Sequence, residues 1–343
     1  MFSPVAVVID AFSAEIRRAY LTAFPHQEPT YADLLESLAR TSLEALANTD
    51  APYHDMEHTI LVTEVGQEIL RAKLQADGGV TARDWLHFVA SLLFHDIGYV
   101  RGVCRADRGG RYVTDREGRL VTPPAGATDA FMTPFHVDRG QIFMHERFAN
   151  DAVLDLDVIC RNIEQTRFPV PEADDYQCVD DYPGLVRAAD LVGQLADPRY
   201  IQKLGRLYAE FCETGEAQRL GYRNAYELRE AYPAFFWNVV SPYISDALRL
   251  LRKTQGGQQV IANLFAHVFE VEHEAPAYGP ERRSGSDRRR QHRDIPAQQN
   301  RRSQPYGRRA TDRQRTSERD QDQDRDSLSA SGTNQPVIKD LDC

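Results

Sequence analysis

Histidine and aspartate side chains recur along this chain in an order that could hold a metal ion. His54 and His58 are four residues apart, His95 and Asp96 are adjacent, and Asp190 follows much later. Imidazole and carboxylate groups are common protein ligands of divalent metal ions. The surrounding segments have the apolar periodicity of buried helices, in which an unpaired carboxylate would be costly. The sequence therefore predicts a divalent metal site that activates water.

Helices must bring these side chains together. A spacing of four residues puts His54 and His58 on one face of a helix or of its entry turn. The pair His95-Asp96 lies at a helix end, just before the stop residue Gly98. Asp190 follows two alanines, small residues that would let another helix approach closely. We therefore expect the five side chains to meet where three helices pack.

The wider chain predicts an all-α fold. Apolar residues repeat at three- and four-residue steps as far as residue 274, and strand patterns are sparse. We expect N-terminal helices in residues 1–49 to pack on a core formed by residues 50–275. The expected helices cover 31–47, 60–74, 81–95, 139–150, 152–166, 182–196, 198–214, 233–252 and 257–272.

One segment, 101–135, interrupts the helical pattern with glycine, proline and arginine. Within it, Tyr112-Val113-Thr114 faces Leu120-Val121-Thr122 across a glycine-containing loop, which is typical of a hairpin. We interpret the segment as a solvated surface excursion. A lid over the site is the alternative, because long loops in folded domains are often functional.

Composition separates an acidic body from a polar C-terminal segment. Hydrophobic residues make up 42% of the chain, yet the mean hydropathy is −0.52. Residues 276–343 carry 15 Lys and Arg against 11 Asp and Glu, a net charge of +4, so with −10 for the whole chain the rest carries −14. We expect this tail to be disordered, with docking to an acidic partner or RNA as the alternative, and its partner stays unknown. An acidic body argues against nucleic acid as a partner of the folded part.

The remaining composition favours a cytoplasmic protein. Its five cysteines have no CxxC spacing, so neither a disulfide framework nor a zinc knuckle is indicated. The apolar run 5–9 is short and lacks the basic start of a signal peptide. No uncharged stretch approaches the roughly 20 residues that span a bilayer, so we expect no membrane association.

The ordered set His58, His95-Asp96 and Asp190 resembles the H…HD…D pattern of the HD-domain superfamily of metal-dependent phosphohydrolases. The resemblance covers residues 50–200 and implies an HD-domain helical bundle that hydrolyses a small-molecule phosphoester, a phosphodiester or phosphomonoester of nucleotide type.

A narrower resemblance concerns the segment YHDMEH, residues 53–58. It is similar to the YHNxxH signature of class I cyclic-nucleotide phosphodiesterases, with Asp55 in place of asparagine. Ala189-Asp190-Leu191, with Pro198 downstream, is similar to the ADLSxP-type segment of those enzymes.

The resemblance implies a role for each residue. His58, His95, Asp96 and Asp190 would bind a first ion, and Asp96 would bridge to a second ion where one is present. His54 would be the general acid that protonates the leaving oxygen. The cofactor would be one or two divalent ions (Mn, Mg, Zn, Fe, Ni or Co), which lower the pKa of bound water from 15.7 to about 7.

Three further residues have open assignments. His136 begins a segment similar to the HxxxGxxxL motif that supplies an additional metal ligand in HD-GYP phosphodiesterases, although Tyr99 replaces their lysine and their later paired histidines are missing. Glu164 is either an acid that supports or bridges the metal site or a helix-surface charge. Arg187, three residues before Asp190, either binds substrate phosphate or orients that carboxylate, or forms a surface ion pair.

Two other functions are open. The first is an HD-domain mixed-valent diiron oxygenase, a class of enzyme whose fold is similar to the one expected here. This hypothesis requires both His136 and His145 to bind iron. The third hypothesis is a non-catalytic sensor that keeps a metal or nucleotide site and signals through the tail.

Overall fold

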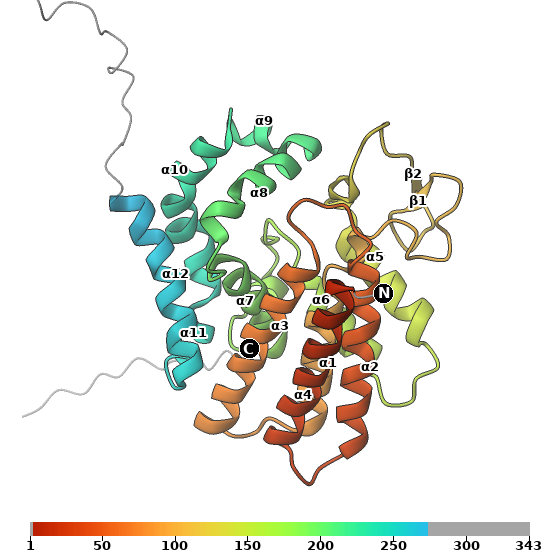
Figure 1. The fold of residues 1–343 in the computed structure, drawn as a ribbon, viewed down its shortest axis with the longest axis vertical. Coiled ribbons are helices and arrows are strands. Elements are labelled where there is room, and N and C mark those ends of the chain that lie inside the picture. Colours follow the sequence, from red (N-terminus) through yellow and green to blue (C-terminus); the bar gives the residue numbers. More distant parts are fainter. Residues whose placement is uncertain (1–2, 274–343) are drawn as a thin grey trace, which may run out of the picture. The chain divides into compact units, whose positions relative to one another are not determined.

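Helices form nearly all the regular structure in the part of the chain that the computed structural model describes, residues 3–273 (Figure 1). The predicted all-α fold is therefore confirmed, whereas the tail 276–343 lies outside the described residues. The α-helices are α1 (Pro4–Ala23), α2 (Pro29–Leu46), α3 (Met56–Ala76), α4 (Ala82–Phe94), α5 (His136–Phe148), α6 (Leu156–Glu164), α7 (Tyr182–Leu195), α8 (Tyr200–Thr214), α9 (Glu216–Leu220), α10 (Ala225–Phe235), α11 (Ser245–Leu251) and α12 (Gln255–His273).

Polar side chains begin the three helices that carry the predicted ligands. The Asp55 carboxylate accepts hydrogen bonds from the backbone N–H groups of Glu57 and His58 at the start of α3. Thr81 opens α4 through a capping box, and Asp181 caps α7. Such caps satisfy N–H groups that have no partner within the helix, each contributing about 1 kcal/mol. They fix where the site helices begin.

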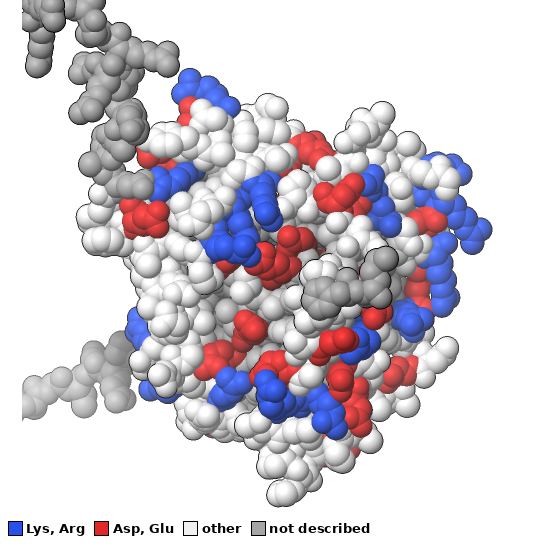
Figure 2. Space-filling view, in the orientation of Figure 1, with Lys and Arg blue, Asp and Glu red and all other residues white. Residues whose placement is uncertain are grey.

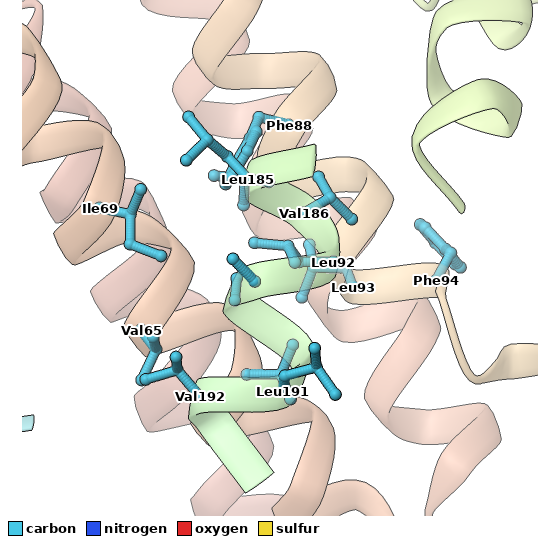
Figure 3. Close-up of a cluster of buried hydrophobic side chains, with 14 of the residues drawn as sticks. Val65, Ile69, Phe88, Leu92, Leu93, Phe94, Leu185, Val186, Leu191 and Val192 are labelled. Carbon is cyan, nitrogen blue, oxygen red and sulfur yellow. The ribbon is translucent and has the colours of Figure 1, made fainter. Parts of the chain in front are cut away.

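The core that positions the site lies between α3, α4 and α7. Figure 3 shows their apolar side chains interdigitating, among them Val65 on α3, Leu92 on α4 and Val192 on α7. A glycine lets two of these helices approach closely. A Cβ added at Gly193 of α7 would lie 2.6 Å from the Val62 Cα of α3. The backbone of α7 therefore rests directly on α3, three residues after Asp190.

The N-terminal helices support the same core. Helices α1 and α2 pack on each other, and α2 packs on α4 (Figure 1). The buried Ser42 hydroxyl of α2 donates a hydrogen bond to the Leu93 carbonyl near the end of α4. This contact lies two residues before His95, so the N-terminal pair steadies the end of the helix that delivers the His-Asp pair.

The predicted hairpin is confirmed. Strands β1 (Tyr112–Val113) and β2 (Leu120–Val121) are antiparallel, with Tyr112 opposite Val121. The rest of the 101–135 insert is not merely a solvated excursion, because Cys104, Ala130 and Met132 are buried. The insert packs onto the helical body.

The single helix predicted over 233–252 is wrong. Helix α10 ends at Phe235, a π-helical turn covers Phe236–Val240, a 3-10 turn covers Ser241–Tyr243, and α11 follows. Pro233 and Pro242 lack the backbone N–H that a continuous α-helix requires. The apolar periodicity survives the break, which is why the pattern alone indicated one helix.

Charged groups of both signs cover the face shown in Figure 2, with Lys and Arg gathered over α8 and along the edge formed by the hairpin. At the start of α8, Arg199 and Lys203 pair with Glu57, and Lys203 also pairs with Asp197. Within residues 3–273, no helix has the length and apolar character needed to cross a membrane.

The close contact between α3 and α7 predicts that a larger residue at Gly193 destabilises the fold. Replacing Gly193 by alanine forces the two backbones apart, and overpacking of this kind costs roughly 1–3 kcal/mol of unfolding free energy. Gly205→Ala is the matched control, because an added Cβ on this exposed face of α8 meets nothing within 4 Å and alanine suits a helix better by about 0.5–1 kcal/mol. Urea denaturation of both variants measures the difference. Equal effects at the two positions would contradict the packing described here.

Candidate metal centre

Four predicted ligands from three helices meet in the interior. The Nε2 atom of His58 lies 3.3 Å from a carboxylate oxygen of Asp96 and 3.3 Å from one of Asp190. The Nε2 atom of His95 lies 3.2 Å and 3.5 Å from the same two oxygens, and 3.4 Å from the His58 Nε2. We call these four residues the ligand cluster. They are remote in sequence, and the packing of α3, α4 and α7 brings them together.

The spacing of these donor atoms suits one divalent ion. Two ligand atoms at about 2.1 Å from an ion are about 3.0–3.4 Å apart for octahedral or tetrahedral angles. The distances of 3.2–3.5 Å within the ligand cluster lie near the upper end of that range. His58, His95 and Asp190 form a group whose ligand atoms lie close enough together to hold an ion.

Hydrogen bonds behind the rings leave the correct nitrogen free. The Nδ1 atom of His95 lies 2.7 Å from the Leu92 carbonyl, and that of His136 lies 2.7 Å from the Thr133 carbonyl. A carbonyl accepts only from a protonated nitrogen, so each Nε2 keeps a lone pair for a metal ion. This is the usual support of a ligating histidine.

Asp96 is the group of the cluster that most requires a facing positive charge. It is buried, and its Oδ2 atom has no hydrogen-bond partner among the described residues. Burial opposes ionisation, but the facing imidazoles of His95 and His58 hold the pKa of Asp96 well below its usual range. The carboxylates of Asp96 and Asp190 outweigh the effect of burial and raise the pKa of His58 and of His95. Without an ion, the cluster therefore holds protons that a divalent cation would replace.

His54 has a different environment from the ligands. Its Nδ1 atom lies 2.6 Å from the Oε2 of Glu210, whose other oxygen accepts the backbone N–H groups of Tyr53 and His54. Burial lowers the pKa of His54, but the Glu210 carboxylate outweighs it and raises the pKa to about 9. The Nε2 side of the ring remains available to the centre. His54, His58 and Asp96 also form a second group that could hold an ion.

Sequence reasoning did not identify Glu210. It belongs to the buried face of α8, on the stripe that Leu204 and Leu207 begin. An acidic residue at an apolar helical position is the pattern that could have indicated it, because such a carboxylate requires a partner.

His136 approaches the centre from the far side of Asp96. Its Nε2 atom lies 3.8 Å from the Asp96 Oδ1, whereas Oδ2 faces His58 and His95. Tyr99 is stacked between two imidazoles, with its ring centre 4.6 Å from that of His54 and 4.5 Å from that of His136. The two oxygens of Asp96 thus face separate groups of nitrogen donors, as in a carboxylate that bridges two ions.

Arg187 does not serve the predicted substrate-binding role in this structure. Its guanidinium is buried, donates hydrogen bonds to Gln165, Tyr176 and Cys178, and lies over the Tyr243 ring. It holds the loop between α6 and α7. The assignment failed because helical spacing gives the face of a residue but not the direction of a long side chain.

Glu164 and His145 make their contacts with residues outside the ligand cluster. Glu164 accepts hydrogen bonds from Gln141, Arg167 and Tyr176. His145 lies 3.7 Å from the Cys160 sulfur. It shares α5 with His136, and nine residues of helix span roughly 13–14 Å. The two histidines therefore cannot join one dinuclear centre, which removes the ligand set that the diiron oxygenase hypothesis requires.

The His54–Glu210 contact predicts a change in protonation. In ion-free Glu210→Gln, the pKa of His54 should fall below about 9, because the carboxylate that contributes most to raising it is then absent. A raised folded-state pKa contributes stability that is complete below the unfolded value and is lost as pH rises through about 9. The folded-state pKa of Glu210 is lowered, so its contribution is lost as pH falls through that pKa. The stability difference between wild type and variant should therefore be largest in weak acid and shrink as pH rises through about 9.

Histidine NMR titration and urea denaturation at several pH values measure both effects. Glu213→Gln is the matched control, since Glu213 lies one turn further along α8 and binds Thr128 instead. An unchanged His54 pKa in Glu210→Gln would contradict the assigned contact.

Comparison with known proteins gives the chain a family. Residues 2–274 match the family model described as Npun_R2479-like, which spans the described helices and every residue of the ligand cluster. A search of curated proteins and a search of solved structures each find no match. Because the match covers most of the sequence, this chain belongs to the Npun_R2479-like family.

Proposed function

We propose that this protein is a metal-dependent phosphohydrolase that acts on a small phosphoester, a phosphodiester or phosphomonoester of nucleotide type. The observation that carries the proposal is the convergence of His58, His95, Asp96 and Asp190, with donor atoms 3.2–3.5 Å apart. The donors suit Mn, Fe, Co, Ni, Zn or Mg, because imidazole and carboxylate accept all of these to differing degrees. The resemblance to the HD-domain superfamily supports the same chemistry.

Divalent ions held here would supply hydroxide at neutral pH and would neutralise charge on a phosphoryl group. The protein's own contribution begins with the cluster, in which the buried His58, His95 and Asp96 fix their ligand directions before any substrate arrives. Asp96, with His136 near its other oxygen, supports a second ion on that side. An anionic substrate requires such ions, since the carboxylates of Asp96, Asp190 and Glu210 would otherwise repel it.

His54 supports the departure of the leaving group. Glu210 holds its Nδ1, so a proton donated toward the centre leaves from Nε2. Because Glu210 raises the pKa of His54, this carboxylate favours the protonated ring that a general acid requires. General acid catalysis of this kind typically contributes about 10²–10⁴-fold to the rate.

A double substitution in the ligand cluster tests the proposal. Wild type, His95→Ala/Asp96→Ala and His145→Ala are purified, their metal content is measured, and each is assayed against cyclic and linear phosphodiesters and phosphomonoesters. The double variant should lose its ions, and its hydrolysis should fall by more than the roughly 10–100-fold that loss of an outer partner costs. His145→Ala should keep both properties, because its side chain contacts Cys160 and not the cluster.

Two results would count against a hydrolase. One is full hydrolysis and full metal content in the double variant. The other is a wild-type protein that binds ions at the cluster but turns over no phosphoester in the panel, which would favour the sensor hypothesis.

A further inference from the structure

The insert and α5 are joined by an ion pair that is completely buried. Arg139 of α5 and Asp107 of the insert each have side chains with 0% exposure, and the closest nitrogen and oxygen atoms are 3.0 Å apart. Burying two charges costs several kcal/mol for each ion unless further hydrogen bonds satisfy both groups. A pair of this kind is weak evidence for stability, so what each partner contacts decides its role.

Every N–H group of Arg139 has an acceptor. The Nε donates to the Gly98 carbonyl at 2.6 Å. One terminal nitrogen donates to Asp107 and to the Val113 carbonyl, and the other donates to Asp107 and to the Val100 carbonyl. An arginine has five N–H donors in a rigid planar fork, and all of them are used here. Lysine could not reproduce this arrangement.

Asp107 organises the insert around the same point. Its carboxylate accepts hydrogen bonds from the backbone N–H groups of Gly102, Cys104 and Val113, at 3.0, 3.3 and 2.9 Å. These groups belong to both the first loop of the insert and the first hairpin strand. The pair therefore connects the folded insert with the chain that follows the His-Asp ligands.

That chain carries Tyr99. The carbonyls of Gly98 and Val100, which Arg139 binds, flank it on either side. The loop also touches the first turn of α5 directly, because a Cβ at Gly98 would lie 1.9 Å from the His136 carbonyl oxygen. Arg139 is three residues after His136 on that helix. One guanidinium thus fixes both the loop that holds Tyr99 and its distance from the His136 turn.

We infer that the Arg139–Asp107 pair is a positioning device through which the insert sets the His136 side of the metal centre. The inference rests on the proposed metal site and extends it, since it assigns to the insert a role in binding the second ion. The first ion would be held by His58, His95, Asp96 and Asp190, none of which belongs to the insert or to α5. The pair should therefore affect the two ions unequally.

Isothermal titration calorimetry of Mn²⁺ binding to the full chain, which resolves the binding steps, tests this inference. Wild type should bind two ions, and His136→Ala should lose or weaken the second step. Arg139→Lys should resemble His136→Ala, with the second step weakened roughly 10–100-fold and the first nearly unchanged. Arg119→Lys is the matched control, because Arg119 belongs to the same insert but is 75% exposed and pairs only within the hairpin. It should bind like wild type.

Several outcomes would overturn the inference. If wild type binds a single ion, the inference is wrong, but the proposed hydrolase function is not affected. If wild type binds two ions but hydrolyses no phosphoester, the proposed hydrolase function is wrong and the inference is not affected. Unchanged binding in Arg139→Lys with a lower melting temperature would show a purely structural pair. Equal weakening of both binding steps would also contradict the inference.

If Arg139→Lys does not fold cooperatively, Asp107→Asn replaces this variant. If neither variant folds, the pair supports the whole fold and the inference is wrong.

Discussion

Two carboxylates, the buried Asp96 and the mostly covered Asp190, impose the constraint on which the rest of the structure depends. Carboxylates in a protein interior need compensating charge, and here the compensation comes from the facing His58 and His95. The imidazoles and carboxylates face one another through the atoms that would bind a metal ion. The backbone carbonyl behind His95 makes its free nitrogen point inward. The proposed hydrolase function follows from this arrangement.

The helices serve that arrangement by approaching unusually closely. Gly193 lets α7 rest on the backbone of α3, and Gly98 lets the loop after the His-Asp pair touch α5. Larger residues at either position would separate elements that each carry a ligand. The caps at Asp55 and Thr81 then fix the register at which two of these helices begin. Small residues and caps, which have no chemistry of their own, thus set the distances in the cluster.

Much of this could be predicted from the sequence, because helical periodicity and the order of the histidines and aspartates are local patterns. The all-α fold, the hairpin and the meeting of the ligands were all expected. Glu210 was missed because it comes from a distant helix, and only tertiary packing brings it to His54. Arg187 was misassigned because the sequence gives no direction for a long side chain. The sequence pattern also assigns no role to Arg139 and Asp107, because only tertiary packing buries them together.

The most direct test of the central claim is anomalous diffraction from crystals grown with Mn²⁺. The account predicts an anomalous peak at about 2.0–2.3 Å from the Nε2 atoms of His58 and His95 and from oxygens of Asp96 and Asp190. Manganese bound elsewhere, with these four side chains apart or joined only by hydrogen bonds to one another, would contradict it.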